Sequence, residues 1–215
     1  MTGGPHFDVS VLTTAYLPPV EYFYAIVHSD RLLIEAHEAY QKQSWRNRCR
    51  ILATGGPEDL SIPVVKEERL SRPVRDIRID YGEPWLQHHI RAFAAAYNHS
   101  AFYDYYADDL IPLERKPVFL FDLNQSLLEK LMSLLDLSVP VTFTETFVKE
   151  YPFFDGRERI QPKYKGESLL AEYGSEQAYY QVFVNRAPGA GFIPNLSILD
   201  LLSAEGPDAG RFLRI

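Results

Sequence analysis

The first 34 residues of the chain carry the pattern that most restricts its fold. Apolar and polar residues alternate over residues 7–11, and Leu12 extends the run, which is typical of a β-strand with one buried face. A proline pair then favours a helix start over residues 18–27, and residues 32–34 form a second apolar run. This order predicts a βαβ unit with two parallel strands in a buried sheet. Because open α/β sheets bind ligands just after such strands, residues 13–16 become a candidate site.

The rest of the chain predicts a hairpin followed mainly by helices. Residues 43–52 and 60–65 are expected to be strands joined by a turn at 54–59. The other expected elements are a strand over 75–79, a helix over 85–97, a helix capped by Asn124 and continuing to 135, an extended segment over 139–147, a long loop over 149–167, a helix over 176–184, and a last helix that Ser197 opens and Asp200 completes as a capping box. Residues 1–215 are therefore expected to form a single α/β domain, with a mixed, mostly parallel sheet in the N-terminal half and a helix-rich second half.

Composition and charge narrow the classes of function. Of the 215 residues, 46% are hydrophobic and 24% are charged, which is the balance of a globular protein with a sizeable core. The formal net charge of −7 offers no positive field to a polyanion, so we expect no nucleic-acid partner. Cys49 is the single cysteine, which excludes an internal disulfide and a cysteine-built zinc site. No signal peptide or membrane span is recognisable, and we expect a cytoplasmic protein.

One short segment is strongly basic within this acidic chain. Lys42, Arg46, Arg48 and Arg50 form a basic island, because residues 39–57 contain no acidic side chain. On a strand the three arginines would share one face and lie within about 7 Å of their neighbours. Like charges at that spacing destabilise a fold unless a partner neutralises them. The sequence therefore predicts a counter-charge close to this segment.

Two kinds of partner could neutralise the basic island. Carboxylates of the protein itself, such as Asp76 or Asp80 on a facing strand, would make the arginines structural. A phosphate or carboxylate group of a ligand, held by two guanidiniums, would make them a binding site. Trp45 has the same ambiguity, because an indole beside arginines can stack on a sugar but is more often part of the core.

The other chemistry-bearing residues are few. His89 lies on the flank of the apolar stripe of the helix expected over 85–97, so it is either a hydrogen-bonded structural residue or a general base, while His88 points away. Neither HExxH nor a Cys/His cluster occurs, so we expect no metal, and no glycine-rich phosphate loop or GxSxG elbow occurs, so we expect no cofactor. The clustered tyrosines suit core packing, a carbohydrate-binding face or a homo-oligomer surface.

Several collinear segments make the chain resemble the WbqC-like protein family. They include Tyr16, the SWRNR block at 44–48, the IPV triplet at 62–64, and the ending NLSILDLL at 195–202 with EGP at 205–207. The resemblance implies a bacterial protein, and some members of the family are encoded in O-antigen gene clusters. It further implies a glycine- or aminoacyl-transferase role on an amino sugar, which has been proposed there.

Two hypotheses follow from the basic island and the resemblance. The first is an acyl or aminoacyl transferase for an amino-sugar intermediate of bacterial surface polysaccharide, with a nucleotide-activated or phosphorylated sugar as its anionic partner. Its expected residues are Arg46 and Arg48 as an anion clamp, Lys42 as added charge, Tyr16 and Trp45 as walls around the sugar, Asn47 as an orienting group and His89 as the general base. The second is a non-catalytic module that binds an anionic metabolite or a protein partner through the face of Arg46, Arg48 and Arg50. If the arginine face opens into a cleft beside His89 and Tyr16, the first hypothesis is favoured, and a flat, exposed face favours the second.

Overall fold

The βαβ unit predicted at the start of the chain is present. Strands β1 (Ser10–Thr13) and β2 (Leu32–Glu35) pair in parallel, and helix α1 (Val20–Val27) connects them. Pro19 is extended immediately before α1, as expected for a residue that fixes a helix start. The structure, a computed structural model, describes residues 4–66, 72–108, 116–184 and 191–214.

Two further strands complete a parallel sheet around this unit. Strand β5 (Val141–Phe143) pairs with β2, and strand β6 (Phe154–Asp155) pairs with β1, which gives the order β5-β2-β1-β6. The predicted α/β fold with a mostly parallel sheet is confirmed, and β5 lies within the segment expected to be extended. The prediction of a loop throughout 149–167 is wrong at β6, because a strand of two residues is too short to show an alternating pattern.

The predicted hairpin is present as a separate antiparallel sheet. It pairs β3 (Arg48–Ala53) with β4 (Gly56–Ser61). The expected strand start at residue 43 is wrong, because Gln43 has a left-handed backbone with φ of 57° and the 3₁₀ helix η1 (Trp45–Asn47) follows it. The turn is also shorter than expected, since Gly56, with φ of 115°, already begins the return strand.

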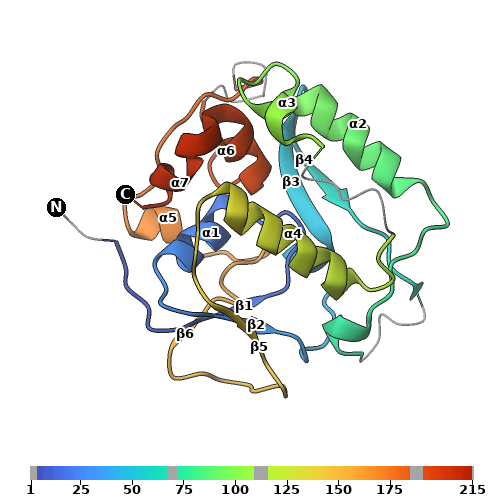
Figure 1. Cartoon of the computed structure of the whole chain (residues 1–215), viewed down its shortest axis with the longest axis vertical. Helices are drawn as coiled ribbons and strands as arrows, with labels where there is room; N and C mark the ends of the chain where they lie inside the picture. Colours follow the sequence, from blue (N-terminus) through green and yellow to red (C-terminus); the bar gives the residue numbers. More distant parts are fainter. Residues whose placement is uncertain (1–3, 67–71, 109–115, 185–190, 215) are drawn as a thin grey trace.

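Helices cover both sheets. They are α2 (Trp85–Tyr97), α3 (Tyr103–Tyr106), α4 (Leu120–Leu134), α5 (Leu169–Glu172), α6 (Ile198–Glu205) and α7 (Ala209–Phe212), with the 3₁₀ helices η3 (Val74–Asp76) and η4 (Gly206–Asp208). In Figure 1, α2 runs beside the β3–β4 hairpin at one end of the molecule, and the parallel sheet lies at the other end. Helix α4 contacts η1 and η3, so it connects the two regions.

Three predictions about individual elements are wrong. The segment 75–79 is not a strand, since it holds η3 and two isolated bridges, Val64 with Ile79 and Arg78 with Phe119. Residues 176–184 contain no helix. Asn124 does not cap α4, which begins four residues earlier at Leu120, and it is instead buried inside the helix.

The last helix begins as predicted but its capping box does not form. The Ser197 hydroxyl accepts a hydrogen bond from the Leu199 backbone N–H at 3.4 Å, as an N-cap does. Asp200, expected to complete the box, instead accepts from the Tyr179 hydroxyl and the Gln181 amide, both at 2.8 Å. Distant residues therefore compete successfully for this carboxylate.

Most of the described buried apolar residues form one large cluster that runs from Leu12 in β1 to Leu213 near the chain end. A second, small cluster groups Leu52, Phe183 and Leu196. Trp45 is 4% exposed within the large cluster, which confirms the core interpretation of this indole. None of the helices in the described ranges combines the length and the apolar character that a membrane span needs.

Candidate functional site

A cleft of about 660 Å³ lies between the β3–β4 hairpin and helix α2. Four residues predicted from the sequence line it, namely Lys42, Asn47, Arg48 and His89. Lys42 and Asn47 lie just before β3, Arg48 begins that strand, and His89 comes from the second turn of α2. The other three predicted residues, Tyr16, Trp45 and Arg46, do not line the cleft.

On the hairpin wall, two arginines share one aspartate. Arg48 donates from Nη1 to Asp59 Oδ2 at 3.0 Å, and Arg50 donates from Nε to Asp59 Oδ1 at 2.7 Å. Asp59 stands directly opposite Arg50 in the antiparallel register. The expectation of a counter-charge on a facing strand is therefore correct in kind, but the expected Asp76 and Asp80 are not that partner.

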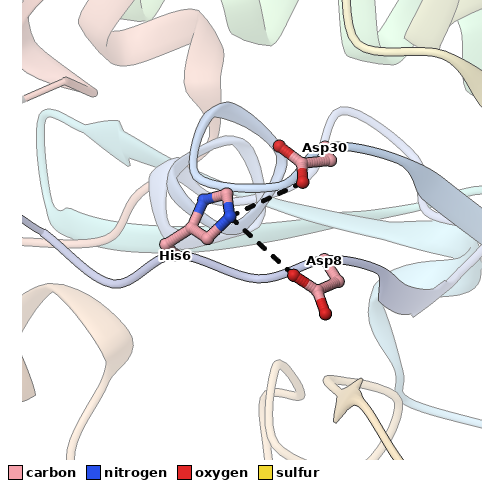
Figure 2. Close-up of side chains that lie close together, drawn as sticks. All are labelled: His6, Asp8 and Asp30. Carbon is pink, nitrogen blue, oxygen red and sulfur yellow. Dashed lines mark ion pairs between the residues drawn. The ribbon is translucent and has the colours of Figure 1, made fainter.

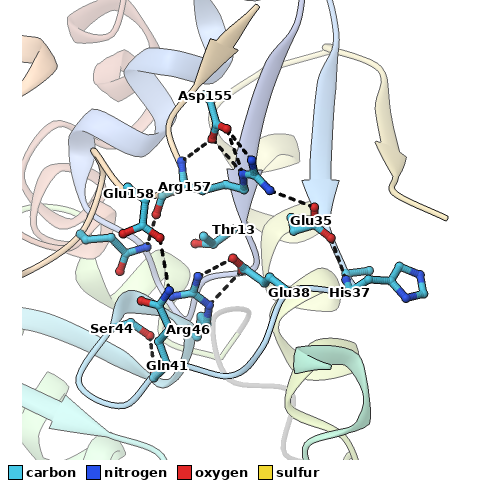
Figure 3. Close-up of polar contacts among 12 residues, drawn as sticks. Thr13, Glu35, His37, Glu38, Gln41, Ser44, Arg46, Asp155, Arg157 and Glu158 are labelled. Carbon is cyan, nitrogen blue, oxygen red and sulfur yellow. Dashed lines mark hydrogen bonds and ion pairs between the residues drawn. The ribbon is translucent and has the colours of Figure 1, made fainter. Parts of the chain in front are cut away.

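Arg46 does not share a face with the other two arginines. The turn of η1 directs it inward, where it is 0% exposed and donates two hydrogen bonds to Glu38, from Nε at 2.9 Å and from Nη2 at 2.6 Å (Figure 3). The predicted ladder of three arginines is wrong, because it required a strand where the chain forms a 3₁₀ turn. The Arg46 guanidinium thus has an internal counter-charge.

The Arg46–Glu38 pair lies beside a second buried ion pair at the carboxyl ends of the parallel strands. Arg157 donates to Glu35 Oε2 at 3.2 Å and to Asp155 Oδ2 at 2.5 Å (Figure 3). These charges occupy the edge where residues 13–16 were predicted to form a ligand site. Residues 13–16 are themselves buried, so this loop is packed inside the protein rather than open.

His89 is held by a hydrogen bond to Tyr16, whose hydroxyl lies 2.9 Å from His89 Nδ1. Burial, followed by the neighbouring His88, lowers the pKa of His89 to about 4, so the ring is neutral at pH 7. Burial raises the pKa of Tyr16 well above its usual value, and the hydroxyl therefore keeps its proton. The protonated Tyr16 hydroxyl donates a hydrogen bond to Nδ1 of the neutral His89 ring, which places the ring proton on Nε2.

Helix α2 supplies a wall that the sequence interpretation missed. Trp85 and His88 line the cleft together with His89, and Glu83 lies just before the helix. His88 is exposed, whereas Trp85 is buried and its Nε1 has no hydrogen-bond partner among the described residues. The spacing of i, i+3 and i+4 from Trp85 to His88 and His89 places the three on neighbouring positions of one helix side, and it was the available signal.

One further group of potential metal ligands lies on the surface. His6 Nε2 is 3.8 Å from Asp8 Oδ1 and 3.5 Å from Asp30 Oδ2 (Figure 2). All three side chains are exposed. The contacts of His6 with the two carboxylates explain why the three lie close together. We assign this group no role.

The parallel βαβ body and the separate hairpin with its polar cleft define an α/β protein. The chain belongs to the WbqC-like protein family, whose model matches residues 14–181. It is also similar to the uncharacterised protein Rv1507c of Mycobacterium tuberculosis, with 29% identity over 232 aligned positions that cover 96% of this chain and 98% of that protein. No solved structure matches the chain significantly.

Proposed function

We propose that the cleft binds an anionic amino sugar, and that the protein is an acyl or aminoacyl transferase, of the glycine-transferring type, acting in the cytoplasm in bacterial O-antigen biosynthesis. The observation that carries the proposal is the meeting of Lys42, Asn47, Arg48 and His89 on one concave surface. A cleft favours chemistry on a small molecule, whereas a non-catalytic module would present a flat basic face. The family resemblance supplies the polysaccharide setting.

The anionic group of the sugar has partners on the hairpin wall. Arg50 already neutralises Asp59, so the second arginine on that carboxylate, Arg48, can turn toward a ligand without leaving Asp59 unpaired. Lys42 is exposed, and no described carboxylate forms an ion pair with it. A guanidinium and an ammonium on one wall suit a phosphate or carboxylate. Asn47 donates its amide to Ile62 O at 2.7 Å, and its buried Oδ1 has no partner among the described residues.

The amine of the sugar has partners on the opposite wall. Glu83 and His88 are exposed there, and a carboxylate attracts an ammonium group before it loses its proton. The mixed charge of the cleft therefore suits a molecule that is itself both anionic and cationic. Trp85 is largely buried but lines the cleft, unlike Trp45, so its accessible edge is the indole available to a sugar.

The transfer step uses the imidazole that can reach the substrate. The amine nitrogen forms a bond to the activated acyl carbon, the bond from that carbon to its leaving group breaks, and the nitrogen passes one proton to a base. His89 was predicted as this base, but its Nδ1 is engaged by the Tyr16 hydroxyl, and its Nε2 then carries the ring proton and cannot accept another. We therefore give proton acceptance to the exposed His88, and we give His89 and Tyr16 the role of positioning the cleft floor.

Binding of glucosamine 6-phosphate, measured by isothermal titration calorimetry, tests the site. Arg48→Gln should raise the dissociation constant about ten-fold or more, since one charge-assisted hydrogen bond is lost. The matched control is Arg211→Gln, because Arg211 is also ion-paired to an aspartate, Asp208, at 3.0 Å but lies outside the cleft. Absence of binding to the wild-type protein, or equal affinity of wild type and Arg48→Gln, would overturn the proposal.

Product analysis by mass spectrometry tests the chemistry. Incubation with an amino-sugar phosphate and activated glycine donors should yield the N-glycylated sugar. His88→Gln should slow its formation by about 100-fold, within the range for loss of a general base, and leave the melting temperature unchanged. Unchanged turnover in His88→Gln would contradict the role given to His88.

A further inference from the structure

A second cavity, of about 510 Å³, lies on the other side of the segment that carries Lys42. Its walls are residues 41–44 and residues of the segment 155–165, which follows β6. Asp155, the last residue of β6, lines it, so the cavity opens at the carboxyl edge of the parallel sheet. Open α/β sheets bind ligands at this edge.

The second cavity has more positive than negative charge. Lys42, Lys163 and Lys165 line it with exposed side chains, and none of the three is ion-paired to a carboxylate among the described residues. Of the two acidic residues in its walls, Asp155 is paired with Arg157, whereas Glu158 accepts only from the neutral Gln41 amide and keeps its negative charge. The three ammonium groups therefore outnumber the one carboxylate in these walls that has no cationic partner among the described residues.

The wall of this cavity also holds an unused hydrogen-bond donor. Arg159 is ion-paired to Glu172 through Nη2, but its Nε is buried and has no partner among the described residues. A buried N–H is normally satisfied by the protein, by water or by a ligand. Because this N–H is enclosed, a phosphate in the cavity could accept from it only after the Arg159 side chain shifts.

We propose that this second cavity binds the phosphate groups of the activated acyl donor. The assignment to a donor rests on the proposed function, because a transferase must hold two substrates side by side. Lys42 lines both cavities and so marks the place where the two substrates meet. In this arrangement the phosphate leaving group of the donor is held by Lys163 and Lys165 in the second cavity. The acyl carbon lies near Lys42, where the amine of the sugar in the cleft can attack it.

Calorimetric titration with inorganic pyrophosphate and with ADP tests the proposal. The double variant Lys163→Gln/Lys165→Gln should weaken the binding of pyrophosphate by about ten-fold or more. The control Lys66→Gln/Lys149→Gln removes the same charge from exposed lysines outside both cavities and should bind as the wild type does. Tighter binding of ADP than of pyrophosphate would identify a nucleotide as the source of the phosphates, and equal binding would identify the diphosphate group itself.

No binding of either probe, or equal weakening in both double variants, would overturn the second site. Failure there is distinguishable from failure of the cleft. If the two sites are separate, Lys163→Gln/Lys165→Gln keeps the affinity for glucosamine 6-phosphate, whereas Arg48→Gln keeps the affinity for pyrophosphate. Loss of glucosamine 6-phosphate binding in the lysine variant alone would instead place the sugar in the second cavity and contradict the proposed function.

Discussion

Arg46 shows how burial changes the meaning of a charged residue. It belongs to the basic island, yet it is fully buried and bonded twice to Glu38, which is itself 5% exposed. Burial raises the pKa of Glu38, while Arg46 opposes that rise. Each residue of the pair therefore needs the other, because either charge left alone in the interior would be poorly solvated.

Replacing Arg46 should consequently destabilise the fold. Arg46→Ala leaves Glu38 buried without a partner and should lower the free energy of unfolding by about 3–5 kcal/mol. Arg211→Ala, at an exposed ion pair with Asp208, should change it by less than about 1 kcal/mol. Urea denaturation followed by circular dichroism measures both. Equal stability of the two variants would show that Arg46 is not structural.

His89 and Asp200 give opposite contributions to the pH dependence of stability. The pKa of His89 is lowered from 6.5 to about 4, so the unfolded state binds more protons in that window and the free energy of unfolding rises with pH. Burial raises the pKa of Asp200 from 3.8 to about 6, so the folded state binds more protons there and the free energy of unfolding falls with rising pH.

Single variants should separate the two contributions. As the pH rises from about 4 to about 6, the free energy of unfolding of Asp200→Asn should increase relative to that of wild type by up to about 3 kcal/mol. As the pH rises from about 4 to about 6.5, the free energy of unfolding of His89→Gln should decrease relative to that of wild type by a similar amount. Urea denaturation at half-unit pH steps gives the two difference curves. Curves with the same slope would contradict these pKa shifts.

At the scale of elements, local signals were readable and long-range ones were not. The helix over 85–97 and the βαβ unit follow from periodicity and proline placement, which act within a few residues. The chain does not continue β3 back to residue 43 because Gln43 has a left-handed backbone. Glutamine has no special preference for that conformation, so the sequence does not predict it. The spacing of Trp85, His88 and His89 on one helix side is a local signal, but the packing of α2 against the β3–β4 hairpin, which makes these residues a cleft wall, is encoded by no local pattern.

The cap of α6 offers a test at this scale. The Ser197 hydroxyl accepts from Leu199 N and donates to Leu17 O at 2.8 Å, so it connects the helix to the turn after Tyr16. Ser197→Ala should lower the free energy of unfolding by about 1–2 kcal/mol. Ser168→Ala, which removes the cap of the four-residue helix α5, should cost about 0.5 kcal/mol. A larger loss at Ser168 in chemical denaturation would refute the importance of the Leu17 contact.

At the scale of the whole molecule, the fold brings two cavities together around Lys42. The sequence indicated the basic island and four residues of the cleft. It missed Asp59 as the counter-charge because the turn expected over 54–59 placed Asp59 outside the return strand, and it missed the second cavity because that cavity joins segments far apart in the chain. Buried ion pairs occupy part of the carboxyl edge of the sheet, and exposed charges line the two cavities. The proposed function therefore depends on the buried pairs being structural and on the accessible cations, Lys42 and Arg48, binding the ligand.

A crystal structure with glucosamine 6-phosphate tests this division of roles most directly. We expect the sugar to lie between the β3–β4 hairpin and α2, with its phosphate bound by Arg48 and Lys42 and its amine directed toward Glu83 and His88. We also expect Arg46 to remain paired with Glu38. A phosphate bound instead by Arg46, or a sugar bound outside the cleft, would contradict it.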